Sequence, residues 1–230
     1  MNASTVSRDQ RIYANVGNLP LIDLLEGDVQ RVLDIGCGAG DNAALIRARF
    51  PYAQISGVTV SPAEAEVARP LFDNCWLFDI EADLPPDLQQ AQFDTLVFSH
   101  VLEHLREPAL VLSRFMLLLQ PGGQILIAVP NVLGWRQRIQ FLAGRFEYES
   151  TGVLDDTHLR FFTYFTADRY LLADCPELQV IHKGATGSVL LWWLRRYVLP
   201  TSWSAAIDRL GCARWPNLFG GQVLIKAVKS

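Results

Sequence analysis

Two kinds of hydrophobic pattern alternate along the chain. Short runs of aliphatic residues, typical of strands buried on both faces, are separated by longer segments whose apolar residues stand three or four positions apart, as in helices. We interpret seven runs as strands, at 30–35, 53–60, 75–79, 94–98, 124–129, 178–183 and 222–228. Strands that alternate with helices at this spacing predict an α/β fold with a doubly wound, mostly parallel sheet.

Helix signals lie between these runs. Residues 11–28 have an apolar pattern that predicts an N-terminal helix, and 42–50 predict the first crossover helix, which Pro51 ends. In the segment 61–64, Ser61 is an N-cap, Pro62 occupies the first helical position and Glu64 completes a capping box. A strongly apolar helix is expected over 107–120, before the turn Pro121-Gly122-Gly123.

The chain has 230 residues, which suits a single domain over 1–230. Residues 185–219 form an insertion between the last two predicted strands and are rich in Trp, Leu and Arg. Within it, 189–199 is apolar nearly all round, with two arginines and several aromatic residues. We consider a lid over a lipid-linked acceptor, a peripheral membrane contact, a buried cover on the sheet and an oligomer contact.

Composition narrows the class of protein. The net charge of −4 and the pI near 5.6 argue against nucleic acid as the main partner. The four cysteines are scattered, which disfavours a zinc site or a disulfide framework and suits a reducing compartment. Residues 1–10 are polar and resemble no signal peptide, and no apolar run reaches the roughly 18 residues of a membrane span. We therefore expect a cytoplasmic protein.

The first predicted strand runs directly into a glycine loop. Gly36, Gly38 and Gly40 occupy every second position after Asp34, and a helix follows. A loop of this kind exposes backbone to a ligand at a helix N-terminus. The dinucleotide motif G-x-G-x-x-G needs a third glycine where Asp41 stands, so the spacing counts against a nicotinamide or flavin cofactor.

The spacing D-x-G-x-G-x-G resembles that of class I S-adenosylmethionine-dependent methyltransferases, similar to the type 11 and type 12 enzymes of polysaccharide and natural-product pathways. Further segments that match the family are 57–61, 93–100 and 117–129, so the resemblance covers about 11–183 together with the last strand. It implies a Rossmann-like sheet of seven strands with the last strand antiparallel, S-adenosylmethionine as cofactor and S-adenosylhomocysteine as product.

The resemblance also implies a cofactor site. Thr59 stands where the family usually has an acid for the ribose hydroxyls, so we expect the ribose to be held less conventionally. Asp79 and Ile80 match the adenine clamp, and Ser99 and His100 should lie beneath the methionine part. The residues expected to bind the cofactor are Asp34, Gly36, Cys37, Gly38, Gly40, Thr59, Val60, Ser61, Asp79, Ile80, Ser99 and His100.

Three histidines are candidate catalytic residues. His158 lies in 154–163, which resembles the L-D-x-T-H-L-R-F-F-T segment of surface-polysaccharide methyltransferases, and we expect it to be the general base, oriented by Asp155 or Asp156. His100 and His104 are four residues apart at the start of a predicted helix, so they would share a face. A fixed structural role is the alternative for these groups.

A metal site is a further alternative. Some relatives place E-x-x-E-H and a later histidine around a divalent metal, and Glu103, His104 and His158 match that pattern. His100 replaces the first glutamate, which makes Mg²⁺ a poor fit, and our main interpretation has no metal. His182, in a predicted edge strand, is expected to be structural.

The resemblance implies a methyltransferase that acts on a small-molecule or carrier-linked acceptor, with O-methylation of a sugar or glycolipid as the first expectation. The alternative is a non-catalytic S-adenosylmethionine-binding scaffold or regulatory protein with the same fold. A nicotinamide-dependent oxidoreductase ranks third.

Overall fold

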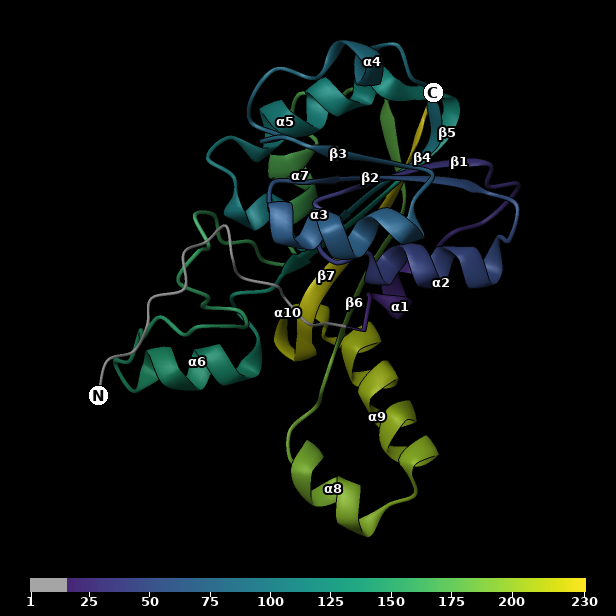
Figure 1. The fold of residues 1–230 in the computed structure, drawn as a ribbon. Helices are drawn as coiled ribbons and strands as arrows, with labels where there is room; N and C mark the ends of the chain where they lie inside the picture. The colour runs from purple at the N-terminus through teal and green to yellow at the C-terminus, as the bar shows by residue number, and fades with distance from the viewer. Residues whose placement is uncertain (1–15) are drawn as a thin grey trace.

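The computed structural model describes residues 16–230, and within them one sheet of seven strands forms the centre of the molecule (Figure 1). The strand order across the sheet is β3-β2-β1-β4-β5-β7-β6. All neighbouring strands are parallel except β7, which is antiparallel to both β5 and β6. The strands are β1 (Arg31–Ile35), β2 (Gln54–Thr59), β3 (Asn74–Leu77), β4 (Phe93–Ser99), β5 (Leu119–Pro130), β6 (Leu178–Gly187) and β7 (Gly220–Lys229).

The connecting segments are mostly helical. The α-helices are α1 (Leu19–Ile22), α2 (Asp41–Arg49), α3 (Pro62–Ala68), α4 (Pro86–Gln89), α5 (Pro108–Phe115), α6 (Trp135–Leu142), α7 (Ala167–Leu171), α8 (Trp192–Val198), α9 (Thr201–Arg214) and α10 (Pro216–Phe219). Single 3₁₀ turns are η2 (Arg69–Leu71), η3 (Leu102–His104) and η4 (Met116–Leu118).

Two hydrophobic cores cover the two faces of the sheet. Successive side chains of a strand point to opposite faces, and β1 shows the result: Leu33 and Ile35 pack in one core, whereas Val32 packs in the other. The first core includes residues of α5 and α7, and the second includes residues of α1 and α2. Burial on both faces explains why the central strands read as continuous apolar runs.

The predicted fold class is confirmed, including the antiparallel last strand. Several element bounds differ from the prediction. The N-terminal helix expected over 11–28 is a single turn, α1, because Asp23 and Leu24 already form a turn; residues 11–15 lie outside the described part. The apolar pattern there reflects burial of Leu21 and Leu25 against the sheet, which needs no long helix.

The helix expected over 107–120 is also shorter. It ends at Phe115 and continues as the 3₁₀ turn η4 to Leu118. The Pro121-Gly122-Gly123 segment lies inside β5, not in a separating turn. The pairing of β4 with β5 shifts register between Phe93 and Thr95, so the strand absorbs these residues as an irregularity at its start.

The insertion begins after Gly187, because β6 continues past the predicted end at Lys183. Its helices α8 and α9 extend away from the sheet in Figure 1, beyond α10. Within the described part of the chain, no helix is both long and apolar enough to cross a bilayer.

Candidate functional site

The glycine loop turns sharply between β1 and α2. Gly36, Gly38 and Gly40 have φ values of 71°, 54° and 92°. A Cβ on Gly36 would lie 2.6 Å from Cγ2 of Val101, so both the backbone conformation and the packing require glycine there. A Cβ on Gly38 would meet nothing closer than Oε1 of Glu64 at 3.9 Å. The loop is therefore packed on one side and open on the other.

Asp34 lies directly behind this loop. Its side chain is fully buried, and within the described part of the protein neither carboxylate oxygen has a hydrogen-bond partner. Burial raises the pKa of Asp34 to about 7. An unpaired buried carboxyl group is costly, which indicates that a ligand or water satisfies it when the site is filled.

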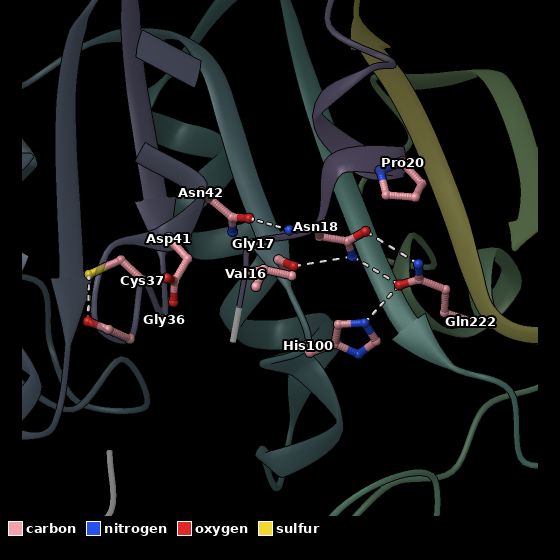
Figure 2. A pocket seen from close by; sticks show the side chains of 12 residues that line it. Val16, Gly17, Asn18, Pro20, Gly36, Cys37, Asp41, Asn42, His100 and Gln222 are labelled. Carbon is pink, nitrogen blue, oxygen red and sulfur yellow. Dashed lines mark hydrogen bonds between the residues drawn. The ribbon is translucent and has the colours of Figure 1, made fainter. Parts of the chain in front are cut away.

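An open cavity of about 610 Å³ lies against the loop. Figure 2 shows its polar wall, in which the side-chain amides of Asn18 and Gln222 bond to each other at 2.9 and 3.2 Å. Asn18 also reaches Oγ of Ser99 at 3.4 Å, and its backbone N–H donates to Oδ1 of Asn42 at 2.9 Å. The lining residues are Val16, Gly17, Asn18, Pro20, Gly36, Cys37, Gly38, Asp41, Asn42, Ser99, His100 and Gln222.

His100 is the histidine at this cavity. Nε2 lies 2.7 Å from Oε1 of Gln222, and Nδ1 lies 3.3 Å from Oε1 of Glu103, so both ring nitrogens face acceptors. Burial lowers the pKa of His100, but the hydrogen bond and the charge of Glu103 outweigh it, and the net pKa lies above the ordinary value. With φ at 55°, His100 is also one of two non-glycine residues with positive φ among the described residues.

Thr59, at the end of β2, is hydrogen-bonded to a carboxylate. Its hydroxyl donates to Oε2 of Glu64 at 3.0 Å, and both side chains are buried. Ser61 is the N-cap of α3, as predicted, and Oγ accepts from the backbone N–H of Glu64 at 3.3 Å. A carboxylate thus lies beside the position where the sequence lacks an acid, at the edge of the glycine loop.

The two residues assigned to the adenine have different environments. Asp79 is exposed, and Oδ1 accepts from the backbone N–H of Glu81 at 2.9 Å, which forms a local turn. Ile80 is buried in the core that contains α5 and α7. Val60, expected near the ribose, is exposed. The adenine assignment stays a prediction.

A second polar cluster lies behind His100. Glu103 is buried; Oε1 contacts His100 and lies 4.0 Å from Nε2 of His158, while Oε2 has no partner among the described residues. His158 is buried too, and Nδ1 lies 3.1 Å from the carbonyl oxygen of Val153. A carbonyl can only accept, so in the neutral ring Nδ1–H donates and Nε2 has the lone pair.

His104 is oriented by a chain of hydrogen bonds. Thr157 Oγ1 donates to Oδ1 of Asp155 at 2.5 Å, which leaves this hydroxyl to accept from Nδ1 of His104 at 2.9 Å. Nε2 of His104 is then also a lone-pair nitrogen. Burial lowers the pKa of His104, and the neighbouring His158 lowers it further. Asp155 therefore orients His104 through Thr157, whereas the carbonyl of Val153 orients His158.

The predicted shared face of His100 and His104 is wrong. His100 ends its strand with positive φ, and η3 is a 3₁₀ turn, so the helical spacing of four does not apply. Glu103 lies between them and contacts His100, whereas the His104 ring packs on His158, with centroids 4.7 Å apart.

Glu103, His104 and His158 form a group with metal-binding potential. Their ligand atoms lie within 4.8 Å of one another. Two lone-pair imidazoles, each fixed through its other nitrogen, and one carboxylate suit Zn²⁺ or Fe²⁺. The same atoms are equally suited to accept a proton.

The cavity brings together five of the residues that were predicted to bind the cofactor: Gly36, Cys37, Gly38, Ser99 and His100. Asp34 and Gly40 adjoin them through the loop. Sequence reasoning missed Asn18, Asp41, Asn42 and Gln222 as lining residues, and it gave Glu64 only a capping role. Gln222 has no local signal at all, because it is 122 residues away from His100, its partner.

Solved structures share this fold. A SAM-dependent methyltransferase from Archaeoglobus fulgidus has a TM-score of 0.58 at 21% identity and covers 92% of this chain and 89% of its own. The plantazolicin methyltransferase BpumL, solved with a pentazolic desmethylPZN analogue and SAH, has a TM-score of 0.58 at 15% identity over 92% of this chain and 81% of its own. At these identities the likeness concerns the fold alone.

Sequence relatives are more similar over shorter segments. Trans-aconitate 2-methyltransferase of Methylobacterium radiotolerans is 37% identical over 101 residues, which span 44% of this chain and 38% of that protein. The Escherichia coli enzyme of the same name is 31% identical over 123 residues, 52% of this chain and 48% of that protein. The chain thus matches less than half the length of these relatives.

A family match covers more of the chain. Residues 8–171 match the family described as "Methyltransferase domain", Methyltransf_23, and this range includes the glycine loop, the cavity wall up to His100 and the His158 cluster. The cofactor of such domains, S-adenosylmethionine, agrees with the open glycine loop and the unpaired carboxyl group behind it. The chain belongs to this methyltransferase family.

Proposed function

We propose that the protein transfers the methyl group of S-adenosylmethionine to a hydroxyl group of a sugar-containing acceptor, either a small molecule or a lipid-linked one. The observation that supports methyl transfer most directly is the open cavity at the glycine loop, with the unpaired Asp34 carboxyl group behind the loop and His100 in its wall. The choice of hydroxyl and sugar is supported by the cluster around His158.

The cavity has complementary ends for an amino-acid group. Asp41 lines the cavity at the loop, with the buried Asp34 behind the loop, and these two would hold an ammonium. His100, with its raised pKa, and the amide of Asn18 would hold a carboxylate. A zwitterion satisfies both ends, and it supplies the cation that the buried Asp34 lacks. The methionine part of the cofactor has this charge pattern.

The ribose is assigned to the pair Thr59 and Glu64. The Glu64 carboxylate lies beside Gly38 and keeps acceptor capacity beyond its bond from Thr59. It would therefore accept hydrogen bonds from the ribose hydroxyls, the task for which related proteins use an acid at the position of Thr59. This assignment explains how the chain tolerates threonine there.

Proton removal is assigned to His158. When bound, the cofactor supplies an activated methyl group, so the protein must position the acceptor oxygen and take its proton. Nε2 of His158 has the lone pair for this step, and the adjacent Glu103 carboxylate stabilises the imidazolium that forms. His100, in contrast, faces two acceptors and is better suited to bind an anionic group.

The acceptor is assigned from the aromatic surface beside this base. The ring centroids of Phe161 and His158 lie 6.4 Å apart. Phe146 packs against Phe161, and Tyr148 packs against Phe146. All three are exposed. Flat apolar faces with a polar tip nearby suit the C–H faces of a sugar ring and its hydroxyl groups.

The test is S-adenosylhomocysteine formation with a panel of nucleotide sugars and polyprenyl-linked sugars. His158→Gln is expected to lower kcat by about 10²- to 10⁴-fold, the usual contribution of a general base, without changing the affinity for S-adenosylhomocysteine. The matched control is His182→Gln, an exposed histidine in β6, which should leave kcat unchanged. Full turnover by His158→Gln on the accepted sugar would refute the assignment.

Two further outcomes separate the alternatives at this site. If chelation abolishes activity and a divalent metal restores it, the cluster of Glu103, His104 and His158 is a metal site, and His158 is not the general base. If S-adenosylhomocysteine binds but no acceptor is ever methylated, the protein is a cofactor-binding scaffold.

Carboxyl methylation is the second candidate function. It is favoured by the similarity to trans-aconitate 2-methyltransferases, whose name states a tricarboxylic substrate. A carboxylate is already deprotonated, so this reaction needs no general base. Turnover of trans-aconitate or related acids that is insensitive to His158→Gln would favour carboxyl methylation over methylation of a sugar hydroxyl.

A further inference from the structure

The insertion between β6 and β7 forms a braced pair of helices. We call residues 188–215, which contain α8 and α9, the distal hairpin; it extends away from the sheet in Figure 1. Inside it, Arg195 Nη2 bonds to Oδ1 of Asp208 at 2.5 Å, and the same oxygen accepts from the backbone N–H of Val189 at 2.8 Å. Arg195 also donates to the carbonyl oxygen of Ser204 at 3.1 Å. The hairpin therefore has an internal polar link that fixes α8 against α9.

The base of the hairpin is closely packed. A Cβ on Gly211 would lie 2.2 Å from Cγ2 of Val189, and Cys212 is buried. The helix α9 also packs against the strand β6 of the sheet. The hairpin is thus a fixed projection.

Its outer surface is strongly apolar. Tyr197 is 83% exposed and Leu210 is 71% exposed. On α9, Trp203, Ile207 and Leu210 follow a spacing of four and three residues, which places them on one face. Exposed leucine side chains, a tyrosine and a tryptophan therefore occur together on one projection, as is typical of an interaction site.

The charge of the hairpin differs from that of the whole chain. Its sequence contains four arginines and a single acidic residue, Asp208, whereas the chain has a net charge of −4. Asp208 is already paired inside the hairpin with Arg195. Arg209 and Arg214 are exposed on α9, and Arg214 stacks on the ring of Trp215. Positive charge and interfacial aromatics on one surface complement an anionic lipid headgroup layer.

We propose that the distal hairpin docks the protein on an anionic lipid surface. The apolar face of α9 and the exposed residues of α8 enter the boundary between headgroups and acyl chains, while Arg209 and Arg214 contact the headgroups. This is binding in the plane of the surface, because neither helix is long enough to span it. A second copy of the chain is the competing occupant, but two copies would bring their arginines together.

Docking would also orient the cofactor cavity. The hairpin leaves the sheet at Gly187 and returns at Gly220, the end of the sheet where Thr186 bonds to Gln222 of the cavity wall at 2.8 Å. β6 is parallel to β5, so this is the same edge at which β1 and β4 deliver the glycine loop and His100. The hairpin and the cavity thus face one side of the molecule. The docking proposal stands on the hairpin alone and does not depend on the acceptor.

The test is flotation of the full chain with vesicles of phosphatidylglycerol and phosphatidylcholine, compared with vesicles of phosphatidylcholine alone. We expect binding to the anionic vesicles only, and weaker binding at high salt. Leu210→Ser should weaken vesicle binding by about tenfold, since it removes a leucine that the contact with the vesicle would bury. Arg209→Gln should weaken it by about fivefold, the usual contribution of one arginine at an anionic surface.

The matched control is Leu117→Ser. Leu117 is 73% exposed, close to the value for Leu210, but it belongs to η4, directly after α5. Figure 1 shows α5 at the end of the ribbon opposite to α8. The Leu117→Ser variant should bind vesicles as the unchanged protein does. All variants should keep their affinity for S-adenosylhomocysteine, which would show that they are folded. Absence of binding to anionic vesicles, or equal loss with Leu117→Ser, would overturn the proposal. A dimer in solution that Leu210→Ser disrupts would assign the surface to a second copy instead.

Discussion

The glycine loop and the cluster around His158 lie on either side of His100, yet they are assembled differently. The loop side comes from two short continuous segments, 34–42 and 59–64, and the hydrogen bonds among Thr59, Ser61 and Glu64 are local. The cluster side joins Glu103 to His158, and His100 to Gln222, across 55 and 122 residues of chain. Local geometry therefore shapes the glycine loop and the turn beside it, whereas the His158 cluster and the cavity wall at Gln222 exist only after the sheet has formed. Three predictions test this difference.

The largest effect is expected in the loop, from Gly36→Ala. The positive φ and the close approach of Val101 should together lower the free energy of unfolding by about 4 kcal/mol and abolish cofactor binding. The control is Gly122→Ala, where φ is 76° but no atom lies within 4 Å, so only the strain, about 2 kcal/mol, applies. Urea unfolding measures the free energy of unfolding, and calorimetric titration with S-adenosylhomocysteine measures the affinity. Equal losses in the two variants would show that packing against Val101 is unimportant.

A smaller effect is expected from Glu64→Gln. Weakening the charged acceptor beside Thr59 should reduce S-adenosylhomocysteine affinity by about 2 kcal/mol, or roughly 30-fold. Glu66→Gln is the control, because Glu66 lies exposed on the same helix and should change nothing. If Glu64→Gln binds as tightly as Glu66→Gln, the ribose is held elsewhere and the cofactor side is less local than we describe.

A third effect, spread over several pH units, is a pH dependence of stability from Asp34. Its pKa is about 7 in the folded protein and 3.8 ordinarily, so between these values the folded state binds more protons than the unfolded state. The free energy of unfolding should therefore fall as pH rises from about 4 to about 7, by at most about 1.4 kcal/mol per pH unit. Denaturant titrations at several pH values measure this slope, and Asp34→Asn should remove the contribution. An unchanged slope in the variant would mean that Asp34 is ionised and paired in solution.

The sequence predicted what depends on neighbouring residues. The strands, their mostly parallel arrangement and the loop from Asp34 to Gly40 follow from apolar runs and glycine spacing, and the structure confirms the fold. The N-cap role of Ser61 was also local and is confirmed. The lack of an acid at Thr59 was visible, but the direction in which the Glu64 carboxylate turns depends on the rotamer and the packing of α3, which spacing does not reveal.

The sequence did not predict what depends on distant contacts or on one backbone angle. The positive φ of His100 breaks the helical spacing on which its pairing with His104 was based. Gln222 and Asn18 meet at the cavity only because β7 is inserted next to β5 and α1 packs across the sheet. For 189–199 the sequence left open a lid, a membrane contact, a buried cover on the sheet and an oligomer contact, because an apolar segment has the same pattern whichever surface covers it.

The position of β7 between β5 and β6 has a consequence during synthesis of the chain. When β6 leaves the ribosome, β7, which separates it from β5, has not yet been made, so β6 can pair in its final place only after β7 follows. Gln222 arrives with that strand and completes the wall of the cavity. A nascent chain that stops short of β7 therefore has the glycine loop but an unfinished pocket. Cofactor binding should thus report completion of the sheet and favour molecules that have finished folding.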